Sequence, residues 1–575
     1  MGINKKDVIK LLETIATFME LKGENPFKIS AFRKAALALE NDDRSLTNIE
    51  DFTKLSGIGK GTAAVIEDYI KTGRSEVLEE LQQQVPKGLL LLLELPGLGG
   101  KKIAKLYHEL SITDLESLKQ ACEDKKVQAL AGFGKKTEEK LLSAINEFGA
   151  RPERLPLSFM LPIADEVENQ LSQMEGVISY ARAGSLRRMR ETIKDIDFII
   201  STNDLKKVQD QLLNLSHLSE VIAIGDTKVS IQLMYDYEVS VDFRLVQPHE
   251  FATTLHHFTG SKEHNVKMRQ LAKERGEKIS EYGVENVETG EVTTYESETD
   301  FFNHFGLSFI PPELREDGTE VEGFDEELEL IHLDDMKGDV HMHSTWSDGA
   351  FSIEEMAEAC RKKGYRYMAI TDHSRFLKVA NGLTPERLVE QRKEIARLNQ
   401  KYDDFTILAG VEMDILPDGT LDLDDDLLQD MDLVIASIHS SFTQPRETIM
   451  KRLKSALHNR HVDIIAHPTG RLIGRREGYD VDVDMLISLA KETNTALELN
   501  ANPNRLDLAS SYLRKAQDAG VKLVINTDAH NIEMLAHMDI GISVAKKGWI
   551  RKENVINTWD YEDLMNFFQR HHRLS

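Results

Sequence analysis

The 575-residue chain contains only two cysteines, Cys122 and Cys360, and they lie far apart in the sequence. A disulfide framework of the kind that holds small secreted proteins together is therefore excluded. No apolar run approaches the roughly 20 residues of a membrane-spanning helix, since the longest, from Leu89 to Leu93, is a short stretch within a helical pattern. The first residues, MGINKKDVIK, lead into an amphipathic helical pattern instead of the apolar core of a signal peptide. We therefore expect a cytoplasmic protein with no membrane partner.

Basic residues are in the minority, because 71 lysines and arginines face 97 aspartates and glutamates, which gives a formal net charge of -26. A protein with this charge does not attract a polyanion over long range, so any contact with nucleic acid must depend on local basic clusters. Low-complexity tracts are also lacking, and 41% of the residues are hydrophobic, as in an ordinary folded protein. A single hydrophobic core is excluded at this length, and about three to five domains are expected.

The pattern of apolar residues changes twice along the chain. Residues 1–150 read as short amphipathic helices separated by Gly turns, which predicts an all-α region. From about residue 156 to 310, apolar runs rich in β-branched residues, DIDFIIS, VSIQLMY and VSVDFRLV, predict an α+β region with a sheet. The acidic segment 311–335 has few apolar residues and is expected to be a linker. After it, seven strand-like segments alternate with helix-length segments, which predicts a parallel (β/α) barrel.

Metal-ligand side chains follow almost every predicted strand of this last region. The segments DVHMH, YMAITDH, ILAGVEMDI, LVIASIH, DIIAHP and LVINTDAH carry His or carboxylate groups near their ends, whereas ALELNA ends in an amide, Asn500. Because the C-terminal ends of barrel strands meet on one face, these groups should converge in one pocket. Such ligands suit Zn, Mn or Fe, and bridging carboxylates allow several ions, which together can activate water and hold phosphate oxygens. Histidines that merely cap strands would not recur at this place so regularly. The candidate ligands are His341, His343, Asp348, His373, Glu412, His439, His467, Asp528 and His530.

This region resembles the PHP family of metal-dependent phosphoesterases over its whole length. The HMH start, the TDH, the Glu, the two later histidines and the closing DAH all match. The resemblance implies a distorted (β/α)7 barrel with up to three ions, Mn2+ or Zn2+, held by the nine residues named above. The loop HPTGRLIGRR adds Arg471, Arg475 and Arg476, which could clamp phosphate by bidentate contacts or form a solvated basic loop.

Three aspartates mark a second candidate metal site. Asp195 and Asp197 lie two residues apart in KDIDF, so their carboxylates share one face of a strand, and Asp242 lies on another predicted strand. Converging carboxylates repel one another unless cations are present, so we expect two Mg2+ or Mn2+ ions that serve in-line phosphoryl transfer. The turn in AGSLRRMR, just upstream, offers backbone N–H groups to phosphate, and its arginines can pair with pyrophosphate.

The succession GSLRR, DID, VDFR and FTGSKEHNVKMR is similar to the family X DNA polymerases, of which polymerase beta is the familiar member. The similarity runs from about residue 1 to 317 and implies a helical DNA-binding domain, fingers, a nucleotidyltransferase palm and a thumb. It further implies that Asp195, Asp197 and Asp242 are catalytic metal ligands, with Asp242 the candidate base for the primer 3′-hydroxyl. The implied nucleotide-binding residues are Gly184, Ser185, Arg188 and Arg154 for the triphosphate, Phe258 and Gly260 for the sugar, Asn265 for the base and Arg269 on the template side.

Three positions depart from the family pattern. His257 replaces the Tyr that usually precedes the Phe, so sugar discrimination is expected to differ. Lys262 occupies the position of a charged residue near the incoming base and could add affinity for the nucleotide. Val65 stands where the family has the Lys that forms the Schiff base, which counts against 5′-deoxyribose-phosphate lyase activity.

Three copies of one Gly-rich pattern occur in the N-terminal region: LSGIGKG, LPGLGGKK and LAGFGKK. Each fits a helix-hairpin-helix turn, whose backbone amides approach a DNA phosphate without obstruction and without reading sequence. One such turn is usually a plain helix cap, but three followed by lysine favour DNA binding. The candidate DNA-binding residues are Gly57, Gly59, Lys60, Gly97, Gly99 and Lys101, with Lys102, Lys135 and Lys136 adding local positive charge.

The order of these regions resembles the bacterial and archaeal family X polymerases that carry a PHP domain. We expect a DNA-directed polymerase that fills short gaps in repair, such as base excision repair, with a metal-dependent 3′-5′ exonuclease in the PHP domain. It would act on gapped or nicked DNA with dNTPs, as a monomer associated with the nucleoid. Two alternatives stay open: the PHP domain acts as a phosphomonoesterase or abasic-site endonuclease, or the chain is a DNA-end-binding scaffold. The expected domains are 1–85 (N-terminal helical), 86–150 (fingers), 151–245 (palm), 246–317 (thumb), 318–335 (linker) and 336–575 (PHP barrel).

Overall fold

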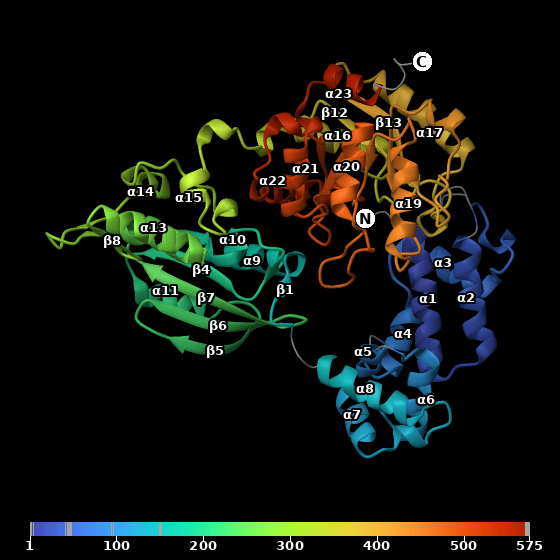
Figure 1. The fold of residues 1–575 in the computed structure, drawn as a ribbon. Coiled ribbons are helices and arrows are strands. Elements are labelled where there is room, and N and C mark those ends of the chain that lie inside the picture. The colour runs from blue at the N-terminus through green and yellow to red at the C-terminus, as the bar shows by residue number, and fades with distance from the viewer. Residues whose placement is uncertain are drawn as a thin grey trace.

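The computed structural model describes residues 3, 5–40, 42, 46, 49–93, 95, 97–148 and 152–569. In Figure 1 the palm and thumb lie at the left, the N-terminal helices at the lower right and the barrel at the top. The barrel contacts both of the other parts, because it pairs with the palm through Arg471 and Glu191 and with the first helix through Asn381 and Lys5. No helix of the described chain is long and apolar enough to cross a membrane.

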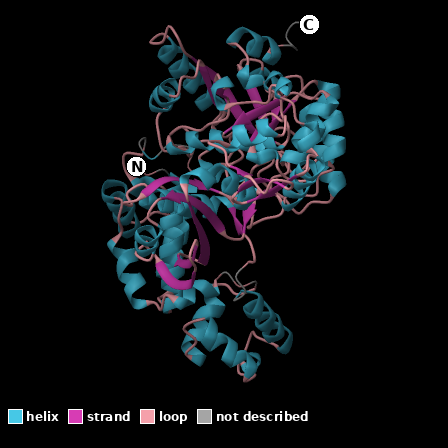
Figure 2. Cartoon of the chain, turned by 90° about the vertical axis from the view of Figure 1, so that its left-hand side faces the viewer, coloured by secondary structure: helices cyan, strands magenta, loops and turns pink. Residues whose placement is uncertain are grey.

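The described residues of the N-terminal region form eight α-helices and no strand, as the sequence predicts (Figure 2). The long helix α1 packs against α2, α4 and α6, and its apolar face supplies much of the region's core, including Leu12 and Ile15. The expected boundary at residue 150 lies outside the described residues. The bounds are α1 (Lys5–Lys22), α2 (Pro26–Glu40), α3 (Lys60–Thr72), α4 (Glu76–Gln84), α5 (Gly88–Leu92), α6 (Gly100–Leu110), α7 (Leu115–Glu123) and α8 (Lys135–Phe148).

The palm is a five-stranded sheet with the order β2-β4-β7-β6-β5, in which β4 and β7 are parallel and the other pairs antiparallel. Because side chains alternate along a strand, Phe198 and Phe243 face the helices α9 and α11, whereas Ile199 faces the opposite side, toward α12. The bounds are β1 (Leu155–Pro156), α9 (Leu157–Leu171), β2 (Val177–Arg182), α10 (Gly184–Arg187), β3 (Thr192–Ile193), β4 (Ile196–Thr202), α11 (Leu205–Leu212), β5 (Leu218–Ile224), β6 (Lys228–Met234) and β7 (Glu238–Val246).

The thumb follows as three helices and a small antiparallel sheet with the order β10-β9-β8. Its core gathers Met268, Phe301 and Phe302. The bounds are α12 (Phe251–Thr259), α13 (Lys262–Glu274), β8 (Glu277–Ser280), β9 (Gly283–Asn286), β10 (Val292–Thr293) and α14 (Glu298–His304).

Segment 311–335, which the sequence predicts to be a linker, folds against the thumb. It forms α15 (Glu320–Gly323) between short 3₁₀ turns, and Leu314, Val321 and Leu330 are buried in the thumb core. The sequence predicts a linker because apolar residues are few here, yet the structure buries three of them. Glu320 is in fact buried and accepts a hydrogen bond from the ring of His264, so pairing allows burial of the charge.

The C-terminal region is a parallel seven-stranded sheet in sequential order, β11 to β17, and a bridge between Met342 and Ala529 brings its first and last strands together. The predicted (β/α)7 barrel is thereby confirmed as a nearly closed barrel. The regular part of the first strand ends at Asp339, so His341 and His343 flank the bridging Met342 beyond it. The strands are β11 (Gly338–Asp339), β12 (Tyr367–Ile370), β13 (Thr406–Asp414), β14 (Leu433–Ser437), β15 (Ile464–Ile465), β16 (Ala496–Asn500) and β17 (Leu523–Asn526). The helices are α16 (Ile353–Lys362), α17 (Pro385–Asn399), α18 (Asp425–Leu428), α19 (Arg446–Leu457), α20 (Val483–Thr493), α21 (Ser510–Ala519), α22 (His537–Lys547) and α23 (Tyr561–Phe568).

Candidate active sites

Nine His and carboxylate side chains converge at the C-terminal end of the barrel. Glu412 on β13 is central, because its two oxygens lie within 3.5 Å of ring nitrogens of five histidines. Asp528 Oδ1 lies 3.1 Å from His343 Nε2, and Asp348 Oδ1 lies 3.3 Å from His530 Nε2. Three overlapping groups of these residues each place their ligand atoms within 4.8 Å of one another, as a site for several ions requires. The structure thus brings together His341, His343, Asp348, His373, Glu412, His439, His467, Asp528 and His530, the whole set expected from the sequence.

The charges of this cluster fit bound cations. Burial opposes charge throughout, yet Glu412 and Asp414 raise the pKa of His439 to about 10. Burial, with His530 and His373 nearby, lowers the pKa of His343 to about 3. Within the described residues, several buried ligand atoms have no hydrogen-bond partner: Nε2 of His341, Nδ1 of His343, His373 and His467, and Oε2 of Glu412. Buried polar atoms normally have a hydrogen-bond partner. The unpartnered ligand atoms, and pKa values shifted upward at His439 and downward at His343, therefore fit a site for divalent metal ions.

Two carboxylates that sequence reasoning missed orient the histidine rings. Glu498 on β16 contacts His341 Nδ1 at 2.6 Å with one oxygen and accepts the backbone N–H of His467 at 2.7 Å with the other. Asp414, two residues after Glu412 on β13, lies 3.2 Å from His439 Nδ1. Carboxylates behind metal-bound histidines fix the ring and its tautomer. The signal was present, because each is an acidic residue on a strand that the sequence predicts to line the barrel.

The arginines near this cluster make different contacts. Arg471 forms a two-pronged ion pair with Glu191 of the palm, at 2.7 and 3.1 Å, and is therefore a bridge between parts of the chain. Arg476 lies over the Phe442 ring, 4.0 Å from its centre, and Arg475 is exposed. Arg505, which sequence reasoning missed, lies 3.7 Å from Asp528 Oδ2 with 19% of its side chain exposed. It is the arginine that contacts a candidate metal ligand.

The parallel neighbours β4 and β7 bring the palm aspartates together. Asp197 and Asp242 are register partners on these strands, and Asp195 immediately precedes β4. Burial raises the pKa of Asp197 to about 7, and repulsion from the two other aspartates adds to it. On β6, Ser230 donates to Asp242 Oδ1 at 2.6 Å and Lys228 Nζ lies 2.8 Å from Oδ2. Lys228 and Arg244 offset only part of this negative charge, so the arrangement suits a pair of divalent cations. Sequence reasoning missed Ser230, which lies in the predicted strand VSIQLMY, and Lys228, which immediately precedes that run.

The Gly-Ser turn lies directly against this site. Gly184 has a φ of 60°, and a Cβ there would lie 2.2 Å from Asp197 Oδ2, so only glycine fits. Ser185 is half-buried beside it. Arg188 donates from Nη1 to the Thr259 carbonyl of the thumb, and Arg154 donates from Nε to Thr192 Oγ1 at 3.1 Å. Of the candidate triphosphate residues, Gly184 thus lies directly against a carboxylate, while the two arginines are held by threonines of the thumb and palm.

The thumb candidates lie on α12, α13 and the turn between them. The Phe258 ring has the Arg244 guanidinium 4.6 Å from its centre, and Gly260, with φ 68°, would bring a Cβ within 3.1 Å of Arg188 Nη1. Asn265, the candidate contact to the nucleotide base, donates to the His257 carbonyl at 2.8 Å. It therefore holds the backbone of His257, the residue that replaces the family's Tyr. Arg269 and Lys262 are exposed on α13.

The three Gly-rich turns share one geometry. The first glycine of each pair, Gly57, Gly97 or Gly132, has a positive φ of 107°, 84° or 92°. The apolar residue that follows it is buried, and its N–H donates to the backbone carbonyl of the leucine three positions earlier, at 3.0 to 3.1 Å. At the second glycines Gly59 and Gly99 a Cβ would meet nothing within 4 Å, so no neighbouring atom crowds this side of the turn, although the Gly59 N–H already donates to Thr62 Oγ1 at 3.0 Å. Lys60 begins α3, Lys101 is the second residue of α6, and both are exposed.

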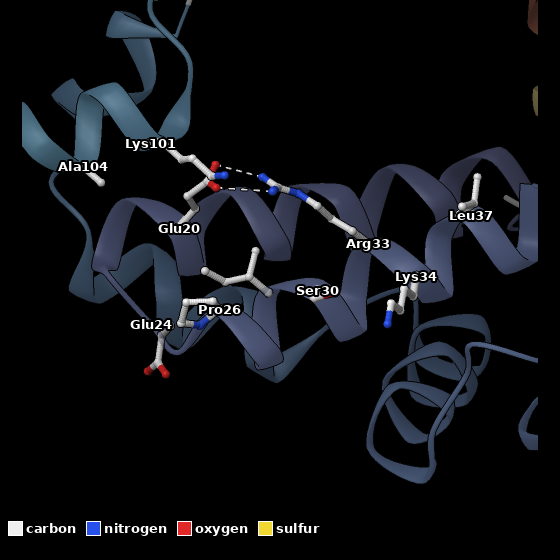
Figure 3. A pocket seen from close by; sticks show the side chains of 10 residues that line it. Glu20, Glu24, Pro26, Ser30, Arg33, Lys34, Leu37, Lys101 and Ala104 are labelled. Carbon is white, nitrogen blue, oxygen red and sulfur yellow. Dashed lines mark hydrogen bonds and ion pairs between the residues drawn. The ribbon is translucent and has the colours of Figure 1, made fainter. Parts of the chain in front are cut away.

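A pocket of about 510 Å³ opens beside the second turn, between α1, α2 and α6 (Figure 3). Its basic side chains are Arg33, Lys34 and Lys101. Glu20 neutralises Arg33 at 2.8 Å, and it also packs so closely on Gly100 that a Cβ there would lie 2.4 Å from its carboxylate. Among the described residues, no acidic side chain forms an ion pair with either lysine. Lys34 and Lys101 therefore supply the unpaired basic charge of this pocket.

Family models match four parts of the chain. They are described as a helix-hairpin-helix domain (residues 3–75), a SAM-like helix-hairpin-helix tandem (89–147), a DNA polymerase beta thumb (254–316) and a PHP domain (339–502). The second model spans the third Gly-rich turn as well as the second.

Whole proteins are similar as well. A Bacillus subtilis protein named DNA polymerase/3′-5′ exonuclease PolX is 65% identical over 568 residues, which is 99% of this chain and 100% of that protein. A probable phosphatase of Thermoanaerobacter is 30% identical over 231 residues, 38% of this chain and 89% of that protein. A probable phosphatase of Shewanella sediminis is 26% identical over 242 residues, 40% of this chain and 93% of that protein.

Proposed function

Because this chain belongs to the PolX family of DNA polymerase/3′-5′ exonucleases, we propose that it is a DNA-directed DNA polymerase that fills short gaps in repair and carries a 3′-5′ exonuclease in its barrel. One observation supports this most directly. The chain holds two separate clusters of candidate metal ligands, one of aspartates in the palm and one of His and carboxylate groups in the barrel. Each suits phosphodiester chemistry, and the hairpin turns supply contacts to DNA.

In the palm, we assign Asp195, Asp197 and Asp242 to the binding of two Mg2+ or Mn2+ ions, which supply charge neutralisation for the triphosphate when bound. Asp242 is the candidate acceptor of the primer hydroxyl proton. The open backbone of Gly184 and Ser185, with Arg188 and Arg154, would hold the triphosphate. Under the incoming nucleotide, Phe258 and Gly260 would support the sugar, while Asn265 and Arg269 would contact base and template.

In the barrel, we assign up to three ions, Mn2+ or Zn2+, to the nine clustered residues, and these ions would supply water activation when bound. Glu498 and Asp414 hold the histidine rings for this purpose. Arg505 is the candidate ligand for the phosphate to be cleaved, because its guanidinium lies at the cluster and can make bidentate contacts.

The substrates would be gapped or nicked DNA and dNTPs, bound by a monomer at the nucleoid. The hairpin turns carrying Gly57, Gly59, Lys60, Gly97, Gly99 and Lys101 would hold the DNA backbone without reading sequence.

A second candidate function concerns the barrel alone. The probable phosphatases match 231 and 242 residues of this chain, about the length of the barrel region, so hydrolysis of small phosphate monoesters is the alternative. It predicts release of phosphate from monoesters by the barrel and no shortening of a DNA primer.

The test follows a 5′-labelled primer in a one-nucleotide gapped duplex with Mn2+, with and without dNTPs. Asp195→Ala should abolish extension only, and His341→Ala should abolish shortening only. The exposed residues Asp210 and His458 provide control variants, Asp210→Ala and His458→Ala, which should behave like the wild type. A wild type that neither extends nor shortens the primer would contradict the proposal, and phosphate release from monoesters by the same protein would then favour the alternative.

A further inference from the structure

Arg188, the central candidate for the triphosphate, already has partners within the protein. Its side chain is only 12% exposed, its Nη1 donates to the Thr259 carbonyl, and its Nε lies 3.4 Å from Glu316 Oε1. Glu316 lies at the end of the thumb, in the acidic segment 311–335. A triphosphate that binds Arg188 must therefore compete with a carboxylate for the same guanidinium.

The carboxylate of Glu316 is shared among three cations. Arg190 Nη1 lies 2.8 Å from one oxygen, and Lys547 Nζ lies 2.5 Å from the other, closer than Arg188 does. Burial opposes the charge of Glu316, but Lys547 and Arg188 outweigh it and keep the pKa of this carboxyl below its ordinary value.

Lys547 comes from the barrel, since it is the last residue of α22. Its side chain is 17% exposed, and its ammonium also donates to the backbone carbonyl of Arg188 at 3.3 Å. The turn before Glu316 packs against α22, and the Glu316 carbonyl accepts a hydrogen bond from Ser261 Oγ at 2.6 Å. The barrel, the end of the thumb and the palm thus meet at this carboxylate, whose backbone is fixed.

We propose that Lys547 of the barrel promotes nucleotide binding in the palm, by holding Glu316 so that Arg188 can exchange this carboxylate for the triphosphate. The inference rests on the proposed polymerase function and adds to it a contribution from the barrel.

The physical reason is the cost of leaving a largely buried carboxylate without a close cation. When Arg188 turns to a phosphate, Glu316 keeps Lys547 and Arg190, so its charge stays paired. Without Lys547, only Arg190 would remain, and its side chain is 47% exposed and solvated. Glu316 would then retain Arg188, and the nucleotide would bind less tightly.

The experiment measures kcat and KM for the dNTP in single-nucleotide gap filling by the full-length chain. Lys547→Met should raise the KM about fivefold or more and change kcat less than about twofold. Glu316→Gln should leave the KM at or below the wild-type value, because Arg188 loses its competitor. In the Glu316→Gln background, Lys547→Met should have no further effect, and Lys547→Arg should retain the wild-type KM. On a dideoxy-terminated primer, which binds the dNTP but cannot be extended, the Kd of the dNTP should rank the variants in the same order as the KM.

The controls are Lys546→Met, the neighbouring lysine on α22, and Glu313→Gln in the turn before Glu316. If Lys547→Met matches Lys546→Met, or if its effect persists in the Glu316→Gln background, the inference is wrong and the proposed function stands. If Lys547→Met lowers primer shortening and thermal stability along with nucleotide binding, its role is structural, which also contradicts the inference. A wild type that incorporates no nucleotide would overturn both.

Discussion

Single residues fix the geometry of both sites through contacts that tolerate little change. In the barrel, His467 and Asp528 have φ values of 28° and 53°, a backbone conformation that residues other than glycine rarely adopt. Backbone of this kind persists where surrounding contacts hold it, and here Glu498 accepts the His467 N–H and Asn500 donates to Asp528. In the palm, Gly184 allows the turn to touch Asp197.

Gly184→Ala tests the close approach in the palm. The added Cβ would overlap Asp197 Oδ2, so the carboxylate or the turn must shift, and we expect gap filling to fall about 100-fold while primer shortening stays intact. Gly225→Ala is the matched control in the same sheet region, since its Cβ would meet nothing closer than 3.8 Å. Equal polymerase activity in both variants would show that the contact is unimportant.

Glu498→Gln tests the orientation of the histidines. The amide retains the shape but loses the charge behind His341, so primer shortening should fall by about 10- to 100-fold, with a weaker apparent affinity for Mn2+. Titration of Mn2+ against the shortening rate measures both effects. Glu492→Gln, at an exposed site on α20, is the control, and an unchanged Mn2+ dependence in Glu498→Gln would refute the assignment.

At the scale of elements, a buried hydrogen-bonded chain joins α12, α13 and α15. His256 Nε2 lies 3.1 Å from His264 Nε2, and His264 Nδ1 lies 2.7 Å from Glu320 Oε1. Glu320 accepts from His264 Nδ1–H, so the other His264 nitrogen must accept from His256. Burial, with His264 and Arg315 nearby, lowers the pKa of His256 well below its ordinary value, and burial also lowers that of His264 despite Glu320. The thumb therefore requires neutral histidines.

This requirement predicts that the thumb weakens in acid. Since folding lowers the pKa of His256, the unfolded chain binds more protons below the ordinary pKa of about 6.5. Stability should therefore fall as pH drops below that value, by at most about 1.4 kcal/mol per pH unit for this group. Hydrogen exchange of α12 and α13 amides at pH 8 and pH 5.5 measures the change. In His256→Gln, which does not titrate, the pH dependence should flatten, and an unaltered slope would contradict the argument.

At the scale of the whole molecule, the barrel is joined to the other parts by polar contacts between distant segments. Arg471 and Glu191 are 280 residues apart in sequence, and Glu316 and Lys547 are 231 apart. Next to Arg471, the loop approaches the palm so closely that a Cβ on Gly474 would lie 2.6 Å from Pro156. The two candidate active sites are therefore held in a defined relation.

Glu191→Ala tests this bridge. It removes the palm partner but leaves the contacts of Arg471 with the barrel carbonyls of Arg505 and Leu506. Glu191 is partly exposed, so the loss of stability should be about 1 kcal/mol or less. We expect a broader distribution of distances between fluorescent labels on α11 and α20, with primer shortening within about twofold of the wild type. Glu153→Ala, which removes a pair within the palm, should leave the distribution unchanged, and an equal distribution in Glu191→Ala would exclude a bridging role.

The sequence by itself determined the fold class and the membership of both clusters. The barrel ligands follow recognisable strands, Asp195 and Asp197 lie at the start of one predicted strand, and the hairpin turns repeat a local pattern, so short-range patterns were sufficient. The tertiary structure alone decided the roles of Arg471, Glu498 and Glu316, and the burial of segment 311–335. Their partners lie far away in sequence, and an arginine or glutamate looks the same in the sequence whether water or a buried opposite charge neutralises it.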